Sequence, residues 1–227
     1  MSLGTGKRKL GRRALLLAAP AAGAGLWAQR RFGRRFMESE NLPLAGSEAE
    51  KRILAVLDEM AREGRLYASV PVSDGRMLRL LTETANAKSV VEIGTSTGYS
   101  GLWFCLALQA TGGRLTTFEI DPGRAQMARD HFKKAGVDGM VTLVEGDAHQ
   151  TTARLKEPID VAFLDADKDG YVAYLNRLLP LVRPGGLILA HNLDMVPDYV
   201  REVTSNPRLD TVLYREGGGL AITLKKR

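Results

Sequence analysis

The sequence predicts an α/β protein built on a doubly wound, mostly parallel β-sheet with helices on both faces. From residue 89 onward, short runs rich in β-branched residues alternate with segments of helical periodicity, and such alternation requires right-handed βαβ crossovers. A closing pair of strand-like runs joined by Gly217-Gly218-Gly219 predicts a hairpin, and so one antiparallel strand at the end of the chain. With 227 residues, the chain has the length of one such domain.

Two helices are expected before the sheet begins. The first covers residues 49–64 and starts at a capping box, in which Ser47 precedes Glu50 by three positions. The second follows Pro71, with Ser73 or Asp74 as its cap, and runs to residue 85. Residues 38–46 form a linker ahead of them, so the predicted domain covers residues 47–227.

The remaining elements alternate up to the closing hairpin. Strands are expected at residues 89–94, 114–120, 140–146, 159–165, 186–192, 209–216 and 220–226. Helices are expected at residues 99–110, 122–135, 148–156, 170–182 and 197–205. The seven strands are expected to form one sheet in which the last strand is antiparallel.

The positive charge of the chain, +6 in total, is concentrated at its N-terminus. Residues 1–37 hold nine basic and no acidic side chains, whereas the other 190 residues hold 23 basic and 26 acidic ones. A domain that binds nucleic acid is usually basic itself. The small negative charge of the domain therefore argues against nucleic acid as a partner.

The basic N-terminal segment encloses an uncharged stretch, residues 14–29. This stretch is short for a membrane span, which needs about 20 residues. Arg12-Arg13 directly before it resembles a twin-arginine export signal. Four interpretations stay open for residues 1–37: an export signal, an uncleaved membrane anchor, a basic helix that lies on a membrane through residues 7–35, and a disordered tail.

Polar side chains, most of them carboxylates, end nearly every predicted strand. In doubly wound sheets, ligands bind at the carboxyl ends of the strands. The residues at these ends are Glu92, Glu119, Asp147, Asp165 and His191. A glycine turn, GTSTG at residues 94–98, follows the first strand at the same edge of the sheet.

This turn matches the G-x-S-x-G nucleophile elbow of α/β-hydrolases, and Ser96, Asp165 and His191 follow in the order that those enzymes use. Two observations count against a hydrolase. The turn follows the first strand instead of a later one, and no glycine-rich oxyanion segment precedes it. A catalytic triad would also leave Glu119 without a role.

A nucleoside cofactor gives Glu119 a role. It lies 21 residues after Gly98, at the end of the next strand, where a carboxylate accepts hydrogen bonds from ribose hydroxyls. Ser96 occupies the place of the glycine that lets a backbone approach a pyrophosphate. The expected cofactor is therefore a nucleoside without a pyrophosphate, and S-adenosylmethionine fits. Glu119 would hold its ribose, the glycine turn its amino-acid portion, and Asp147 would lie near the adenine.

Several motifs resemble one known family. They are VVEIGTSTGYSGLWFCLAL, TTFEID, VEGDA, VAFLDADKDGYVAYLNRLLPLVRPGGLILAHN and GGGLAITLKK. Together they are similar to the catechol and caffeoyl-CoA type of class I S-adenosylmethionine-dependent O-methyltransferases, over about residues 66–227. The resemblance implies a Rossmann-like sheet of seven strands, methyl transfer to a hydroxyl of a small phenolic or catechol-like acceptor, and a homodimer.

The resemblance also implies roles for single residues. The expected cofactor contacts are Glu92, Gly94, Ser96 and Ser100 at the methionine end, Glu119 at the ribose, Asp147 and Ala148 at the adenine, and Val70 above the cofactor. Asp165 would bind a divalent metal and lie near the cofactor, and Lys168 would be the general base. Without such roles, Asp165 would be a helix-capping carboxylate and Lys168 a surface lysine paired with Asp167 or Asp169.

The sequence departs from the family at its metal site. The last two ligands of the family are an Asp-Asn pair, and here the pair is His191-Asn192. Magnesium prefers oxygen ligands, so a set of Asp165, His191 and Asn192 favours manganese, iron or zinc over magnesium, or weakens metal binding. The other interpretation is a metal-free site in which a neutral His191 forms a hydrogen bond with a neighbour.

A second departure follows Asn192, where the sequence passes directly into a helix. The acceptor pocket is therefore expected to be open. Two alternatives to the O-methyltransferase remain: a non-catalytic or metal-independent S-adenosylmethionine-binding protein, and an RNA methyltransferase of the same fold. Because S-adenosylmethionine is made in the cytosol, the catalytic domain is expected to face the cytoplasm, whether or not the N-terminal segment reaches a membrane.

Overall fold

The computed structural model describes residues 1, 41–63, 69–156 and 158–227. Apart from Met1, the predicted signal or anchor segment at residues 1–37 lies outside the described residues, as do the first three residues of the predicted linker. Within the described part of the chain, no helix is both long and apolar enough to span a bilayer. The described residues from Asn41 onward belong to one compact unit.

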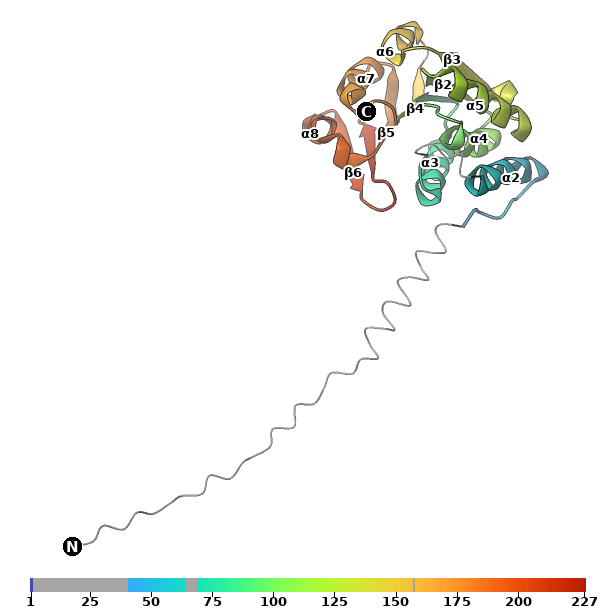
Figure 1. The fold of residues 1–227 in the computed structure, drawn as a ribbon. Helices are drawn as coiled ribbons and strands as arrows, with labels where there is room; N and C mark the ends of the chain where they lie inside the picture. Colours follow the sequence, from blue (N-terminus) through green and yellow to red (C-terminus); the bar gives the residue numbers. More distant parts are fainter. Residues whose placement is uncertain (2–40, 64–68, 157) are drawn as a thin grey trace. The chain divides into compact units, whose positions relative to one another are not determined.

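Seven strands form a single sheet in the order β3-β2-β1-β4-β5-β7-β6 (Figure 1). The strands are β1 (Ser89–Ile93), β2 (Arg114–Glu119), β3 (Val141–Glu145), β4 (Ile159–Leu164), β5 (Val182–His191), β6 (Leu209–Tyr214) and β7 (Leu220–Lys225). The pairs β1–β2, β1–β4, β2–β3 and β4–β5 are parallel, whereas β7 is antiparallel to both β5 and β6. The predicted sheet, mostly parallel with an antiparallel last strand, is confirmed.

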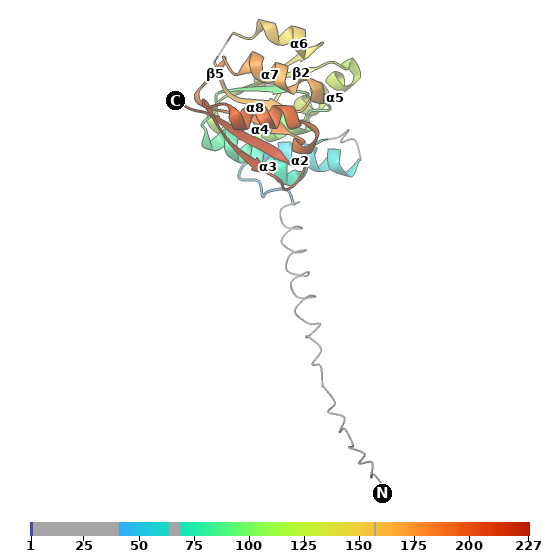
Figure 2. The same cartoon turned by 90° about the vertical axis from the view of Figure 1, so that its left-hand side faces the viewer.

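Helices cover both faces of this sheet, as predicted (Figure 1, Figure 2). On one face lie α2 (Glu48–Arg62), α3 (Val72–Thr84), α4 (Tyr99–Thr111) and α5 (Pro122–Ala135), which share a core cluster with the sheet. The opposite face packs against α7 (Tyr171–Leu178) and α8 (Pro197–Ser205) in a second cluster. The short α6 (Ala148–Thr151) follows β3 at the edge where the parallel strands end.

Helix α2 begins close to where its capping box predicts. The hydroxyl of Ser47 accepts a hydrogen bond from the Glu50 amide at 3.1 Å, which satisfies an amide that the first helical turn leaves without a partner. The Glu50 carboxylate accepts a hydrogen bond from the Gly46 amide at 2.7 Å, one residue before the usual partner in a capping box. The two bonds fix the start of the helix at Glu48.

Helix α4 is buried along nearly its whole length, which explains why its sequence is apolar on every side. Gly98 and Gly101 make this burial possible, because a Cβ atom at either position would press against the Phe132 ring of α5. Cys105 has no exposed surface in this helix, and burial raises the pKa of its thiol. The only cysteine of the chain is therefore an unreactive core residue.

The expected cap of the second helix was wrong. Helix α3 starts at Val72 with Pro71 as its N-cap, so Ser73 and Asp74 lie inside the helix and neither caps it with its side chain. Pro71 suits this position, because the helix has no use for an amide there and the fixed φ of proline is compatible with a helix start.

The boundary between α7 and β5 also differs from the expectation. The helix expected to reach residue 182 ends at Leu178, and β5 starts at Val182, four residues before its expected start. The strand runs through Pro184 and Gly185, which usually mark a loop. A register shift opposite β4 and a positive φ of 78° at Gly185 allow the strand to include them as an irregularity.

Candidate active site

The parallel strands bring the predicted polar residues to one edge and one face of the sheet. Side chains alternate between the two faces along a strand. Since Val90, Leu115, Phe163 and Leu189 contribute to the core cluster beneath α3 and α4, residues two or four positions later face the same way. By this alternation, the face that α3 and α4 cover receives Glu92, Glu119, Asp165 and His191.

The turn after β1 adopts backbone conformations that favour glycine. Gly94 has a φ of 100° and Gly98 a φ of 91°, while Ser96 between them has a φ of 48°. A Cβ atom on Gly94 would also overlap the carbonyl of Asp165. The carbonyl of Phe118 accepts hydrogen bonds at 3.0 Å from the amides of Gly94 and the next residue. The turn therefore lies against the ends of β2 and β4, where the strand order reverses.

Glu92 is fully buried beside this turn. Its carboxylate accepts hydrogen bonds from the hydroxyls of Ser100 and Thr117, each at 2.6 Å. Thr117 lies directly beside Glu92 in the parallel register of β1 and β2. Burial, only partly offset by these two bonds, raises the pKa of Glu92 to about 7. A cation bound at this edge of the sheet would favour the ionised form of Glu92.

Glu119 joins the end of β2 to the glycine turn. One carboxylate oxygen accepts a hydrogen bond from the Ser96 amide at 2.7 Å, and the other accepts one from the Asp121 amide at 2.9 Å. Each carboxylate oxygen has a second lone pair, so both can accept further hydrogen bonds. The side chain therefore keeps the capacity to bind the two hydroxyls of a ribose.

Asp147 and Ala148 begin α6 at the same edge. The Asp147 carboxylate caps this helix by accepting a hydrogen bond from the His149 amide at 2.8 Å. The His149 ring stacks on the ring of Tyr174 in α7, with centroids 4.3 Å apart. Asp167 contacts both rings, at 2.7 Å from the Tyr174 hydroxyl and 3.2 Å from Nε2 of His149. These contacts connect α6 to α7 beside the predicted adenine position.

His191 lies at the end of β5 between two carboxylates. Its Nε2 is 2.9 Å from Oδ2 of Asp74 in α3, and its Nδ1 is 3.4 Å from Oδ2 of Asp165. The second contact is within ion-pair range but lacks hydrogen-bond geometry. Burial by itself lowers the pKa of His191, but the carboxylates of Asp165 and Asp74 outweigh burial and raise the pKa to about 9. At neutral pH, His191 is therefore a buried imidazolium.

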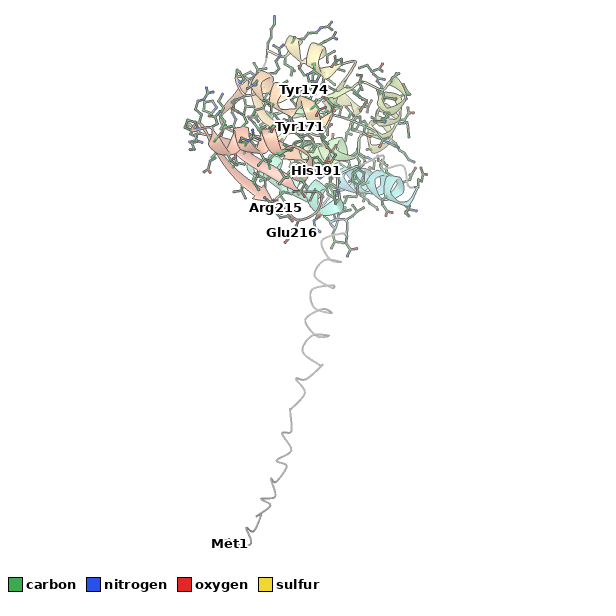
Figure 3. All side chains as sticks on the ribbon, turned by 60° about the vertical axis from the view of Figure 1, so that its left-hand side comes forward. Met1, Tyr171, Tyr174, His191, Arg215 and Glu216 are labelled. Carbon is green, nitrogen blue, oxygen red and sulfur yellow. The ribbon has the colours of Figure 1, made fainter. Side chains whose placement is uncertain are left out.

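Lys168 approaches Asp165 from the other side. Its Nζ lies 2.9 Å from Oδ1 of Asp165 and 2.9 Å from the hydroxyl of Tyr171, which donates to the backbone carbonyl of His191 at 3.3 Å. Tyr171 and His191, both labelled in Figure 3, are both buried. Burial would raise the pKa of Asp165, but the cations of His191 and Lys168 hold it below its usual value. Lys168 therefore pairs with Asp165 and not with its acidic neighbours in sequence.

The residues predicted to bind a metal do not form a free ligand set. Both oxygens of Asp165 face cations, and both nitrogens of His191 face carboxylates. A metal needs a neutral histidine nitrogen and would have to displace these partners. Asn192 follows His191 in a left-handed conformation, with a φ of 60°. Among the described residues, no cluster of three or more His, Cys, Asp or Glu side chains is arranged to hold a metal ion. The residues as arranged do not fit a divalent cation.

The same geometry excludes the hydrolase triad. A triad histidine holds the nucleophile with one ring nitrogen and the carboxylate with the other. Both ring nitrogens of His191 face carboxylates, so neither is available to Ser96. The amide of Ser96 instead donates to Glu119. The GTSTG turn is therefore not the nucleophile elbow of a hydrolase triad.

Two predicted cofactor residues have apolar side chains. Val70 precedes α3 and is packed into the core cluster with 3% of its surface exposed. Ala148, the first residue of α6, is half-buried against the second core cluster. Ala148 borders the strand-end edge, whereas Val70 lies beneath the surface.

Sequence reasoning missed Asp74, Thr117 and Tyr171. An acidic residue near a helix start is read as a cap, and nothing local indicates that Asp74 contacts a residue 117 positions later. Thr117 could have been predicted as a site residue, because the parallel register of β1 and β2 places it beside a buried glutamate. The contact of Tyr171 with Lys168 could also have been predicted, because the two residues are three positions apart. That spacing brings side chains together in a helical turn.

A family model described as O-methyltransferase matches residues 45–217. The match includes every strand-end residue of the site and all but the last of the seven strands. The chain belongs to the O-methyltransferase family. Its class I fold and strand-end acidic residues agree with the resemblance found in the sequence.

Two curated relatives of this O-methyltransferase family member are themselves named O-methyltransferases. The catechol O-methyltransferase of Niastella koreensis is 38% identical over 145 residues, which are 62% of this chain and 65% of the relative. The caffeoyl-CoA O-methyltransferase of Populus kitakamiensis is 38% identical over 129 residues, which are 55% of this chain and 54% of the relative. The matches thus span between half and two thirds of the length of these relatives.

A solved structure has the same fold as this O-methyltransferase family member. The O-methyltransferase of Bacillus cereus, solved in complex with SAH, has a TM-score of 0.71 and 24% sequence identity. The similarity covers 84% of this chain and 96% of the other. At this level of identity, the similarity supports the fold alone.

Proposed function

We propose that this chain is an S-adenosylmethionine-dependent O-methyltransferase that methylates a hydroxyl of a small phenolic or catechol-like acceptor. The observation that carries the proposal is the cluster of Glu92, Glu119 and Asp165 at adjoining strand ends, with Lys168 bound to Asp165. Buried carboxylates suit a ligand that combines positive charges with ribose hydroxyls. The names of the two curated relatives support the class of acceptor.

Each part of the cofactor has matching groups in the chain. Glu119 would accept hydrogen bonds from the ribose hydroxyls, and Asp147 at the start of α6 would border the adenine. The glycine turn with Glu92 and Ser100 would hold the amino-acid end. Positive charge on the cofactor would favour the ionised form of Glu92, since an opposite charge favours a charged carboxylate.

The side chains around Asp165 would accept the proton that the acceptor hydroxyl loses. When bound, S-adenosylmethionine supplies the methyl group, and the electron pair of the broken carbon–sulfur bond stays on sulfur as the new carbon–oxygen bond forms. Lys168 is an ammonium beside Asp165, so it would first release a proton to solvent. Its neutral amine would then take the hydroxyl proton of the acceptor, and Asp165 at 2.9 Å would stabilise the ammonium that forms again. The other task of the site is to align acceptor and donor, which alone lowers a barrier considerably.

The proposal extends to the rest of the chain. Residues 7–35 associate with a membrane, and the catalytic domain, residues 47–227, then faces the cytoplasm; the alternative is that residues 7–35 direct export. The domain forms a homodimer. The nine basic side chains in residues 1–37 support attraction to an anionic membrane surface. Nucleic acid is not a partner, because the remainder of the chain has a net negative charge.

Calorimetry with S-adenosylmethionine tests the cofactor assignment. Glu119→Gln should weaken binding at least about 10-fold, because hydrogen bonds to a charged group contribute roughly 1.5 to 3 kcal/mol each. The matched control is Glu145→Gln, which alters the exposed glutamate directly beside Glu119 in β3 and should leave the affinity unchanged. Equal affinities for both variants and the wild type would reject the cofactor site at this strand end.

Turnover separates the proposal from its alternatives. A screen of catechol acceptors should yield methylated product. A non-catalytic S-adenosylmethionine-binding protein would bind the cofactor and methylate no acceptor, with or without metal. An RNA methyltransferase would transfer the methyl group to RNA and not to small phenols.

A further inference from the structure

A buried ionic network connects three distant parts of the chain behind the strand-end site. Asp74 of α3 contacts His191 at the end of β5, His191 faces Asp165, and Asp165 binds Lys168. The side chains of Asp74 and His191 are only 1% and 4% exposed, and those of Asp165 and Lys168 are 13% and 23% exposed. The charges alternate in sign along the network, so the network is neutral as a whole.

The turn between β6 and β7 closes on this network. The Gly218 amide donates a hydrogen bond to Oδ2 of Asp74 at 2.8 Å. A Cβ atom on Gly217 would overlap the Asp74 carboxylate, and one on Gly218 would overlap Nε2 of His191. Only glycines let the backbone pack this closely. Arg215 and Glu216, at the start of this turn, are labelled near the lower edge of the domain in Figure 3.

This arrangement determines which cations can approach Asp165. A buried carboxylate needs a compensating charge, and Asp165 has two cations, Lys168 at Oδ1 and His191 at Oδ2. A divalent ion bound to Asp165 would lie close to both of them. Repulsion between like charges at short distance is strong in a poorly solvated site. Each oxygen of Asp165 therefore already faces a cation, and the carboxylate has no uncompensated charge for a metal.

We infer that Asp74 is a positioning residue that holds the His191 ring against Asp165, and that this network of paired side chains takes the place of a divalent metal in the acceptor site. The inference rests on the proposed methyltransferase function. It accounts for the histidine that replaces the acidic residue of the family, for the carboxylate buried in α3, and for the glycines of the β6–β7 turn. The site then works without a metal.

Histidine side-chain NMR of the full-length protein with added Mn²⁺ tests metal binding directly. The chain has three histidines, so the ring signals of His131 and His149 serve as internal references. We expect that, with Mn²⁺ added, the His191 ring signal is no broader than that of His131. The His131 ring forms a hydrogen bond with the carbonyl of Thr97. Selective loss of the His191 signal at stoichiometric Mn²⁺ would overturn the inference.

A double variant, Asp74→Asn with His191→Asp, is the matched positive control. It removes the imidazolium and gives Asp165 an acidic neighbour, so the ligand set becomes all oxygen, which suits Mg²⁺ and Mn²⁺. Calorimetry should show that it binds Mn²⁺ at least about 10-fold more tightly than the wild type. If the wild type binds Mn²⁺ as tightly as the double variant, the network does not exclude a metal and the inference is wrong.

Turnover with a catechol acceptor gives an independent measurement. The wild-type kcat should stay within about twofold when a chelator is added. Asp74→Asn should lower kcat at least about 10-fold and leave the KM for S-adenosylmethionine within about twofold, because it affects alignment and not cofactor binding. A purely structural role would lower Tm and leave kcat unchanged at low temperature. Asp169→Asn removes an exposed carboxylate next to Lys168 and should behave as the wild type.

The inference and the proposed function fail in different ways. If the protein does not bind S-adenosylmethionine, the proposed function is wrong, and the Mn²⁺ titrations still decide whether the network excludes a metal. If the chelator abolishes turnover and Mg²⁺ restores it, the inference is wrong and the proposed function stands.

Discussion

At the scale of single residues, Glu92 shows how the burial of a carboxylate can oppose stability. The carboxylate is fully buried, and burial raises its pKa to about 7 although Ser100 and Thr117 donate hydrogen bonds to it. Between pH 4.5 and about 7, the folded protein keeps a proton on Glu92 that the unfolded chain has lost. The free energy of unfolding therefore falls as the pH rises through this range.

The Glu92→Gln variant removes this titration. Its stability relative to the wild type should rise between pH 4.5 and about 7 and stay constant above, by about 1.4 kcal/mol per unit of pKa shift. The variant should also bind S-adenosylmethionine more weakly, because glutamine cannot become the anion that the cofactor favours. Denaturant unfolding at acidic and alkaline pH, together with calorimetry, measures both effects. A stability difference independent of pH would contradict the raised pKa.

His191 contributes to stability with the opposite dependence on pH. Burial opposes its charge, but Asp165 and Asp74 raise its pKa from 6.5 to about 9. The stabilisation is complete below pH 6.5 and is lost as the pH rises through about 9, because the folded state then releases the proton. Relative to His191→Gln, the wild type should lose stability over this range in unfolding titrations with chelator present. A neutral His191 would produce no such loss.

At the scale of elements, the β6–β7 turn makes a tertiary contact that can be tested with one methyl group. Gly218→Ala places a Cβ atom against Nε2 of His191, and overpacking of this kind costs about 1 to 3 kcal/mol. Gly139→Ala is the matched control, because a Cβ atom there meets nothing within 4 Å and should change stability by less than about 0.5 kcal/mol. Equal losses in denaturant unfolding would show that the turn does not pack on His191.

The elements themselves were largely predictable, because alternating strands and helices with right-handed crossovers allow few arrangements. Boundaries were predictable where a local interaction fixes them, as Ser47 does for α2. They were not predictable where sheet pairing overrides a local pattern. Pro184 and Gly185 are typical of a loop, but β4 pairs with Val182 before them and with Leu187 after them, and the strand includes them as an irregularity.

In the candidate site, too, some features could be predicted from the sequence and others could not. Glu92 and Glu119 could be predicted as site residues, because both lie near strand ends and alternation places them on one face. The protonation state of His191 could not be predicted, because it depends on a contact with Asp74. Asp74 lies 117 positions away, on a helix before the first strand. Without that contact, a neutral histidine that binds a metal is a reasonable expectation. With it, His191 is a cation.

At the scale of the whole molecule, positive charge and the candidate active site belong to different parts of the sequence. Nine basic side chains fall within residues 1–37, and the remainder of the chain has three more acidic than basic residues. The described residues from Asn41 onward form one compact unit that contains every strand-end residue of the site. Attraction to an anionic surface and binding of the cofactor should therefore be separable.

A chain that begins at residue 38 tests this separation. Its affinity for S-adenosylmethionine should stay within about twofold of the full chain, because residues of the compact unit supply all the described contacts at the site. It should lose binding to vesicles that contain anionic lipid, since each Lys or Arg near such a surface contributes about 1 kcal/mol. Cosedimentation of the full chain with vesicles at low and high salt separates two causes of vesicle binding. Binding through charge weakens at high salt, because salt screens the attraction. Binding through insertion of the uncharged residues 14–29 persists at high salt. Vesicle binding by the shortened chain would instead place the membrane contact on the domain.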